Sequence, residues 1–282
     1  MNWKAYYQLA RFHKPLGILL LWCPTAWALW IANKGDPDFN IMLLLLLGTI
    51  LMRAAGCVMN DIADRQIDLH VQRTKNRPLT SGLVKLPNAL IFLFALLSGA
   101  LLILLQLPST CFYYALIALA VTIAYPFCKR IIQGPQMVLG IAFSLGIPIA
   151  FAASNVLPNG SMGLLLLINF AWIIAYDTQY AMVDRADDLR IGVKSTAILF
   201  ARYDRLIITL LQIFVHFSWL PLAIALKLSV WFYSGWIMAS FILFYQYYLL
   251  ASKKEENYFR AFCSNGWYGL IIWVSIIVGF IN

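Results

Sequence analysis

The chain has 282 residues, of which 62% are hydrophobic and only 12% are charged. A soluble domain carries about 25% charged residues, so the composition excludes an ordinary soluble protein. Apolar runs of about 18 residues recur along the chain, and each is long enough to cross a bilayer core. A transmembrane β-barrel would show short alternating segments instead. The sequence therefore predicts an all-α, polytopic membrane protein.

Nine hydrophobic segments are the predicted membrane spans. In chain order they cover residues 16–33, 41–59, 89–107, 110–128, 134–153, 161–178, 206–226, 230–250 and 266–281. Long polar connections follow the second and the sixth span, which are equivalent places in the layout. The spacing predicts a single domain, 1–282, with two four-helix halves (about 16–128 and 134–250) and a ninth helix.

The basic residues predict the orientation of these spans. Most of the 21 Lys and Arg residues lie in the connections on one side, while Lys34 and Lys227 lie on the other. By the positive-inside rule the loaded side is cytoplasmic, which puts the N-terminus inside and the C-terminus outside. This topology accounts for the net charge of +9 without nucleic-acid binding. No Arg- and Ser-rich leader is visible, so we expect a bacterial inner membrane rather than an organelle.

The first polar connection begins with a row of oxygen-bearing side chains. Asn60, Asp64 and Asp68 fall at about 0°, 40° and 80° around an ideal helix, so they share one face. Asp61 sits beside this face, and Arg53 lies on it seven residues earlier, within the second span. The pattern predicts that the helix of this span continues past the membrane surface with an acidic ridge.

The second polar connection repeats the pattern. Asp184 and Asp188 fall within about 20° of Asp177 on an ideal helix, with Tyr180 to one side. Gly192 is expected to end this helix because glycine is common just past a helix C-terminus. Two acidic faces are therefore predicted at the cytoplasmic ends of two long helices.

Carboxylates packed this closely repel one another unless a cation compensates them. Mg²⁺ takes oxygen ligands from a few carboxylates, waters and substrate phosphates, so two such faces could hold Mg²⁺ around a diphosphate. The neighbouring cations would bind the remaining phosphate oxygens: Arg73, Lys75, Arg77, Lys129, Arg130 and Lys194. The alternative is that the same acids and cations form ion pairs within the loops.

Arg53 is a separate candidate. A cation inside a span costs about 2.5–3.5 kcal/mol on insertion scales, so such a residue usually has a function. Its alternative role is that of a partner for Asp61 or Asp64.

The chain resembles the UbiA-type intramembrane prenyltransferases at these same residues. The stretch NDIADRQID, residues 60–68, fits the family motif NDxxDxxxD, and YDTQYAMVDRADDLRIGVKST, residues 176–196, contains its DxxxD as Asp184 and Asp188. The resemblance covers essentially the whole chain. The residues around both motifs are most similar to those of the family branch that prenylates 4-hydroxybenzoate for ubiquinone biosynthesis.

The resemblance implies nine helices around a central cavity that opens to lipid, with an active site on the cytoplasmic side. It also implies two Mg²⁺ ions and a catalytic role for Asp64, Asp184 and Asp188. The expected metal ligands are Asn60, Asp61, Asp64, Asp68, Asp184 and Asp188. The expected substrate-binding residues are Arg53, for the carboxylate of the aromatic acid, and Arg73, Arg77, Lys129, Arg130, Asp177, Tyr180 and Lys194.

The reaction implied by the resemblance is transfer of a polyprenyl group, such as octaprenyl, from its diphosphate to 4-hydroxybenzoate. The group would join the ring carbon ortho to the hydroxyl. A naphthoate, homogentisate or a porphyrin remains a possible alternative acceptor. A divalent-cation transporter is the alternative from another class, but an ion path would need acids at the midplane and on the far side.

Overall fold

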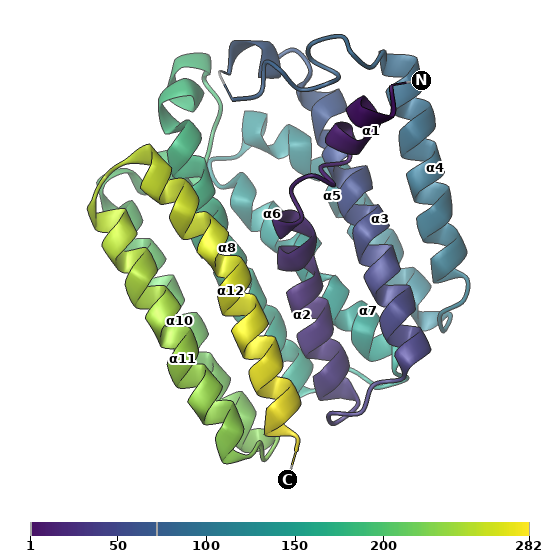
Figure 1. Cartoon of the computed structure of the whole chain (residues 1–282), viewed down its shortest axis with the longest axis vertical. Coiled ribbons are helices and arrows are strands. Elements are labelled where there is room, and N and C mark those ends of the chain that lie inside the picture. Colours follow the sequence, from purple (N-terminus) through teal and green to yellow (C-terminus); the bar gives the residue numbers. More distant parts are fainter. Residues whose placement is uncertain (1, 72, 282) are drawn as a thin grey trace.

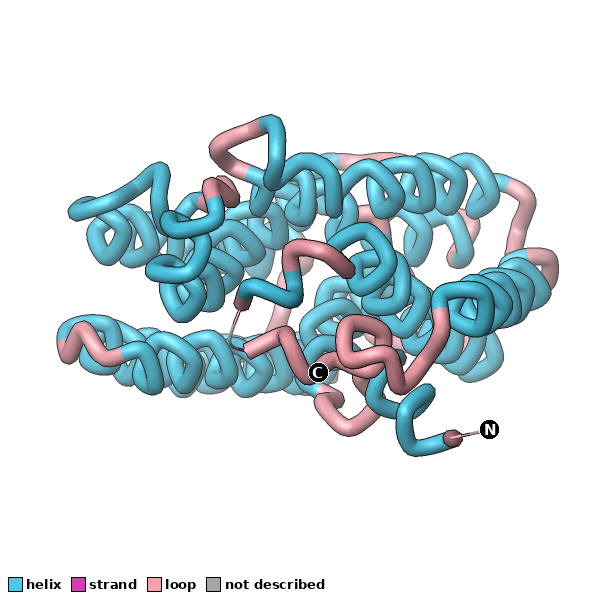
Figure 2. Tube along the Cα trace, turned by 90° about the horizontal axis from the view of Figure 1, so that it is seen from above, coloured by secondary structure: helices cyan, strands magenta, loops and turns pink. Residues whose placement is uncertain are grey.

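The computed structural model describes residues 2–71 and 73–281, which form helices and loops without any strand (Figure 2). Seven helical segments among them are long and apolar enough to cross a membrane, and Leu16–Ala32 is a shorter apolar helix. The all-helical class predicted from composition is therefore confirmed.

The helices follow the predicted segments closely. In chain order they are α1 (Trp3–Leu9), α2 (Leu16–Ala32), α3 (Phe39–Asp64), α4 (Leu86–Leu104), α5 (Thr110–Ile131), α6 (Pro135–Ser144), α7 (Gly146–Ala153), α8 (Gly160–Ile191), α9 (Thr196–Phe200), α10 (Asp204–Ala225), α11 (Val230–Ala251) and α12 (Glu255–Gly279), with short 3₁₀ turns at Asp68–His70 and Ala201–Tyr203. Each predicted span coincides with one helix, or with the pair α6 and α7. The number of membrane crossings stays a prediction.

The long helices run side by side between two ends of the molecule (Figure 1). One end carries α1 and the connection between α3 and α4, and the C-terminus lies at the opposite end (Figure 1). The last helix, α12, packs against α11, α2 and α8, while α3 packs against α4. The termini thus lie at opposite ends, as the predicted topology requires, whereas the side facing the cytoplasm stays a prediction.

Tryptophan side chains fill the centre of the bundle. The ring of Trp27 on α2 lies 5.0 Å from that of Trp172 on α8 and 5.1 Å from that of Trp219 on α10, centroid to centroid. Trp27 also donates a 3.1 Å hydrogen bond from Nε1 to the carbonyl of Gly269 on α12. Between helices in lipid, close packing and such bonds provide most of the attraction.

Buried amides join four of the helices. Asn265 on α12 accepts from Trp172 Nε1 at 3.1 Å and donates to Gln179 Oε1 at 2.8 Å. Gln179 on α8 donates to Gln246 Oε1 on α11 at 3.0 Å, and Gln212 on α10 donates to the same oxygen. These bonds fix how α8 is rotated about its axis, and therefore where its acidic face points.

Two predicted helix limits are wrong and one is confirmed. The helix of the second span ends at Asp64 instead of continuing through Asp68, which begins a 3₁₀ turn held by a 3.0 Å bond from Thr74 Oγ1 to the Asp68 carbonyl. The last helix begins at Glu255 rather than near residue 266. Gly192 does end α8, with a φ of +74° that favours glycine.

Candidate active site

A cavity of about 1360 Å³ opens between α2, α3, α4, α5 and α8. Leucines from α4 and α5, including Leu97, Leu101 and Leu119, form much of its wall. Polar groups lie among the lining residues at the end nearest α1 and the connection between α3 and α4. The cavity is therefore suited to a long apolar molecule with a polar head.

Arg53 lies inside this cavity, on α3, together with Asp177 on α8. The Nε of Arg53 is buried and makes no hydrogen bond within the described chain. A Cβ atom at Gly17 of α2 would lie 2.4 Å from both Nε and Nη2 of Arg53, so glycine there makes room for the guanidinium. The alternative prediction, that Arg53 pairs with Asp61 or Asp64, is wrong, because both aspartates have other partners.

Tyr176 is a polar group in the cavity wall that the sequence analysis missed. It is 2% exposed, and its hydroxyl has no hydrogen-bond partner in the described part of the structure. Tyr125 of α5 lines the cavity too. A buried polar atom without a partner costs about 1–3 kcal/mol, which a polar ligand would offset. In the sequence these tyrosines look like any others in the spans. They are distinguished only because α3, α5 and α8 pack around one cavity.

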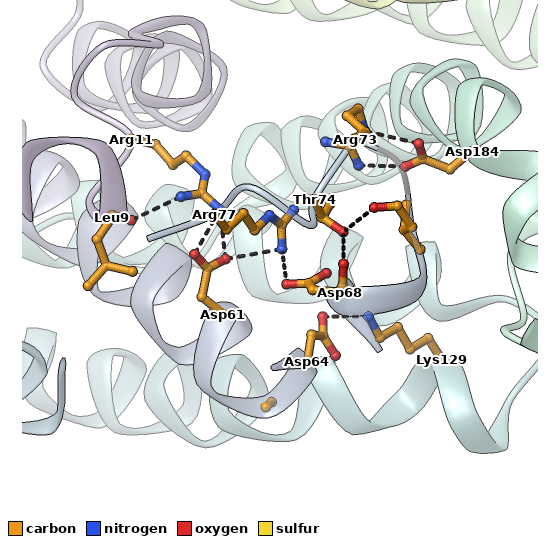
Figure 3. A network of polar contacts seen from close by, with 12 residues as sticks. Leu9, Arg11, Asp61, Asp64, Asp68, Arg73, Thr74, Arg77, Lys129 and Asp184 are labelled. Atoms are coloured by element: carbon orange, nitrogen blue, oxygen red, sulfur yellow. Dashed lines mark hydrogen bonds and ion pairs between the residues drawn. The ribbon is translucent and has the colours of Figure 1, made fainter. Parts of the chain in front are cut away.

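Asp61 and Asp68 share one arginine at the mouth of the cavity (Figure 3). Arg77 Nη1 donates to Asp61 Oδ1 at 3.1 Å and to Asp68 Oδ2 at 2.7 Å. Arg11, from the turn after α1, donates from Nη2 to both oxygens of Asp61 at 2.7 and 3.0 Å. The first acidic motif is therefore neutralised by cations from two separate segments.

Asp64 and Asp184 are each joined to a cation from a distant part of the chain (Figure 3). Arg73 donates to both oxygens of Asp184 at 2.9 and 2.5 Å, and its guanidinium lies 4.8 Å from the ring centre of Tyr180. Lys129 at the end of α5 is ion-paired with Asp64 Oδ2. Both acidic faces thus meet at the same end of the molecule.

Two predicted substrate-binding cations bond to backbone carbonyls in this structure. Arg130 Nη2 donates to the carbonyl of Ala63 at 2.7 Å, and Lys194 Nζ donates to that of Ile131 at 2.7 Å. Neither is among the residues that line the cavity, and the same holds for Asp188, which is half-buried. The predicted residues that line the cavity are Arg53, Asn60, Asp61, Arg73, Arg77, Asp177 and Tyr180.

Ion pairs within one loop form between Arg77 and both Asp61 and Asp68, whereas the other pairs named above join separate segments. The site also fits a hard cation. Within residues 2–71 and 73–281, no three His, Cys, Asp or Glu side chains converge as a metal site. However, Oδ1 of Asp64 is buried without a hydrogen-bond partner, and the surrounding acids offer only oxygen. A hard divalent ion prefers such donors, and it would replace the ammonium and guanidinium groups as the compensating charge.

Arg11 and Lys14 belong to the same mouth, although in the sequence they counted only toward topology. Both line the cavity. Partial burial, together with the charges of Arg73, Arg11 and Arg77, lowers the pKa of Lys14. The three arginines that contribute to this lowering concentrate positive charge at the mouth, which suits a polyanion. Their place just before the first span, on the side predicted to be cytoplasmic, was the only available signal in the sequence.

The fold and the site define a multi-pass membrane protein with an apolar cavity under a mouth of carboxylates and cations. The sequence profile of the UbiA prenyltransferase family matches residues 21–274. The chain belongs to that family.

Two curated relatives cover nearly the full length of the chain. A 4-hydroxybenzoate octaprenyltransferase of Legionella pneumophila (strain Paris) is 57% identical over 97% of both chains. A 4-hydroxybenzoate octaprenyltransferase of Aliivibrio fischeri (strain MJ11) is 47% identical over 97% of this chain and 95% of its own. The predicted family resemblance is therefore confirmed.

Solved structures share the fold at low sequence identity. The apo structure of a UbiA homolog from Aeropyrum pernix K1 has a TM-score of 0.76 at 22% identity, over 93% of this chain and 97% of that one. A UbiA homolog from Archaeoglobus fulgidus bound to GPP and Mg²⁺ has a TM-score of 0.72 at 16% identity, over 98% of both chains. These likenesses concern the fold alone.

Proposed function

We propose that this protein transfers a polyprenyl group from a polyprenyl diphosphate to 4-hydroxybenzoate, giving 3-polyprenyl-4-hydroxybenzoate for ubiquinone biosynthesis. The observation that carries the proposal is the apolar cavity of about 1360 Å³, with the acidic motifs at its mouth and inside it the cation of Arg53, whose Nε has no hydrogen-bond partner among the described residues. Relatives that bear this activity in their names, at 47–57% identity, support the choice of acceptor.

The acidic motifs would hold the metal of the reaction. Asn60, Asp64, Asp68, Asp184 and Asp188 are the proposed ligands, for two ions, with the unpartnered Oδ1 of Asp64 as one donor. When bound, Mg²⁺ neutralises the departing diphosphate and so assists cleavage of the allylic C–O bond. Arg73 and Arg77 would bind the remaining phosphate oxygens, because charge-assisted hydrogen bonds to phosphate are strong.

The protein itself would bind and orient the reactants and exclude water. The apolar wall shields the electron-poor allylic carbon from water after its bond to diphosphate breaks. Electrons of the ring carbon ortho to the hydroxyl form the new C–C bond, and transfer of the ring proton to a carboxylate of the site or to the departing diphosphate restores aromaticity. Arg53 would bind the carboxylate of the acid, which fixes the orientation of the ring.

The proposed donor is octaprenyl diphosphate, whose tail would extend through the apolar part of the cavity toward lipid. We place the protein in a bacterial inner membrane, with the mouth of the cavity at the cytoplasmic side. The distribution of Lys and Arg along the sequence supports this orientation.

Membranes that contain the protein provide the direct test. We expect labelled 4-hydroxybenzoate, octaprenyl diphosphate and Mg²⁺ to give one apolar labelled product, and EDTA to abolish it. A product formed from a naphthoate, homogentisate or a porphyrin but not from 4-hydroxybenzoate would overturn the assignment of 4-hydroxybenzoate as the acceptor. Uptake of Mg²⁺ into vesicles that contain the protein, without any prenylated product, would instead support the alternative of a divalent-cation transporter.

A further inference from the structure

Asp61 is bonded differently from the other acids of its motif. Its side chain is 1% exposed, and both of its oxygens accept hydrogen bonds. Oδ1 accepts from Arg11 Nη2 at 2.7 Å and from Arg77 Nη1 at 3.1 Å, and Oδ2 accepts from Arg11 Nη2 at 3.0 Å. The carboxylate is thus held by two arginines from different segments and is shut off from solvent.

The comparison with Asp64 and Asp184 is informative. Asp64 is paired with one lysine and keeps a buried oxygen without a partner. Asp184 is bonded at both oxygens but by Arg73 alone, and its side chain is 16% exposed, so movement of one side chain would free it. Freeing Asp61 would require two arginines to leave a buried carboxylate, one of them anchored elsewhere.

Arg11 is that anchored residue. It has a φ of +59°, in the region that side-chain-bearing residues rarely adopt. Its Nη1 donates to the carbonyls of Gln8 and Leu9 at 3.0 and 3.4 Å, at the end of α1. The guanidinium therefore joins α1 to Asp61 on α3, and the strained turn keeps it there.

We propose that Asp61 is a positioning residue rather than a magnesium ligand: it holds Arg77 and Arg11 at the cavity mouth to receive the diphosphate. The inference rests on the proposed function. In the described structure the hydrogen bonds of Arg77 to Asp61 and Asp68 use only Nη1. Because Nη1 is fixed, Nε and Nη2 keep a set direction from which to donate to an anion.

The direction in which the diphosphate affinity changes distinguishes a positioning role of Asp61 from a purely electrostatic one. Replacing Asp61 by Asn removes a negative charge, which by itself would tighten the binding of any anion. If Asp61 positions the arginines, the same substitution weakens anion binding because the guanidinium groups lose their fixed direction. A metal ligand, in contrast, would be detected by the loss of divalent-ion affinity.

The test uses the full chain in detergent with two probes that need no turnover. Free Mn²⁺ is counted by EPR in the presence of inorganic diphosphate, and diphosphate affinity is measured by calorimetry. For Asp61→Asn we expect Mn²⁺ affinity within about threefold of the original and diphosphate binding weaker by about tenfold, the effect of one charge-assisted bond. Asp64→Asn is expected to lose Mn²⁺ affinity, and Asp36→Asn, at an exposed position that does not line the cavity, serves as the charge control with neither effect.

Loss of Mn²⁺ affinity in Asp61→Asn to the extent seen in Asp64→Asn would overturn the inference, as would unchanged or tighter diphosphate binding. If Asp61→Asn does not fold, Arg11→Lys decides, because it keeps the positive charge but cannot reproduce the fixed geometry of the arginine bonds to Asp61. Weaker diphosphate binding at unchanged Mn²⁺ affinity supports positioning, and tighter Mn²⁺ binding identifies Asp61 as a ligand. If the original chain binds neither probe, the proposed function itself fails.

In turnover, the same role predicts a split between kinetic constants. Asp61→Asn should raise the KM for the prenyl diphosphate while the Mg²⁺ concentration needed for half-maximal rate stays unchanged. A general structural defect would lower the amount of active protein without moving either constant.

Discussion

Arg53 and Gly17 form one functional unit at the scale of single residues. The guanidinium lies in the cavity wall, within a predicted span, where a cation costs about 2.5–3.5 kcal/mol on insertion scales. Its Nε has no partner in the described chain, and Gly17 leaves the space that it occupies. A carboxylate bound there would offset this cost, which is why we assign the acid end of the acceptor to this position.

Arg53→Ala should raise the KM for 4-hydroxybenzoate by about tenfold or more, because a charge-assisted hydrogen bond is lost. The KM for the prenyl diphosphate should change little. Gly17→Ala should act in the same direction, since its Cβ would lie 2.4 Å from the guanidinium. Gly163→Ala is the matched control, because nothing lies within 4 Å of a Cβ there. Initial rates with each substrate varied separately measure the effect, and equal changes in both KM values would argue for a structural role.

Asp64→Ala and Asp184→Ala should each lower the rate by about 100-fold or more, because charge that develops on the diphosphate would lose its stabilisation. Asp36→Ala is the control, since Asp36 is exposed between α2 and α3 and does not line the cavity. Rates are compared at equal amounts of inserted protein. Near-normal rates in both variants would remove the acidic motifs from the mechanism.

At the scale of elements, the buried amides of α8, α10, α11 and α12 connect packing to the site. Gln179 is completely buried, and it lies on the helix that carries Asp177 and Asp184. In a bilayer, such bonds between helices contribute modestly to stability but restrict how each helix can turn. The second acidic face is therefore directed by residues remote from the chemistry.

Asn265→Ala should destabilise the fold by about 1–3 kcal/mol, because Trp172 Nε1 and Gln179 Oε1 would lose their buried partner. Thermal unfolding in detergent is the measurement, with a lower apparent Tm expected. Asn257→Ala, at a half-buried position in the first turn of the same helix, should leave the Tm unchanged because its amide donates to Ser252 in an exposed turn. An identical Tm for both variants would show that the network contributes nothing.

At the scale of the whole molecule, charge and topology make one prediction. The N-terminal helix α1 and the connection between α3 and α4 lie at one end, and the C-terminus lies at the other (Figure 1). That connection carries Arg73, Lys75, Arg77 and Lys85. Because cationic connections remain in the cytoplasm, alkaline phosphatase fused after residue 281 should be active in a bacterial host. A fluorescent protein at the N-terminus should fold and fluoresce. Phosphatase activity from the N-terminal fusion alone would reverse the orientation.

The sequence by itself determined the class of the protein, most helix positions and both acidic motifs. These depend on local properties: hydrophobic length sets a span, and spacing sets a helical face. The predicted helix through Asp68 failed because propensity cannot show that Thr74 bonds back to the Asp68 carbonyl. The prediction that Gly192 ends α8 was correct because glycine readily adopts positive φ, a property of its own backbone that does not depend on distant residues.

Only the tertiary structure decided which charges meet. Arg11 and Asp61 are 50 residues apart, and Arg73 and Asp184 are 111 apart, so no local pattern pairs them. The same holds for the room that Gly17 leaves for Arg53. A sequence motif specifies which groups are present, whereas partners and burial follow from how distant helices pack. That is why the acids of one motif, alike in sequence, differ so much in their surroundings.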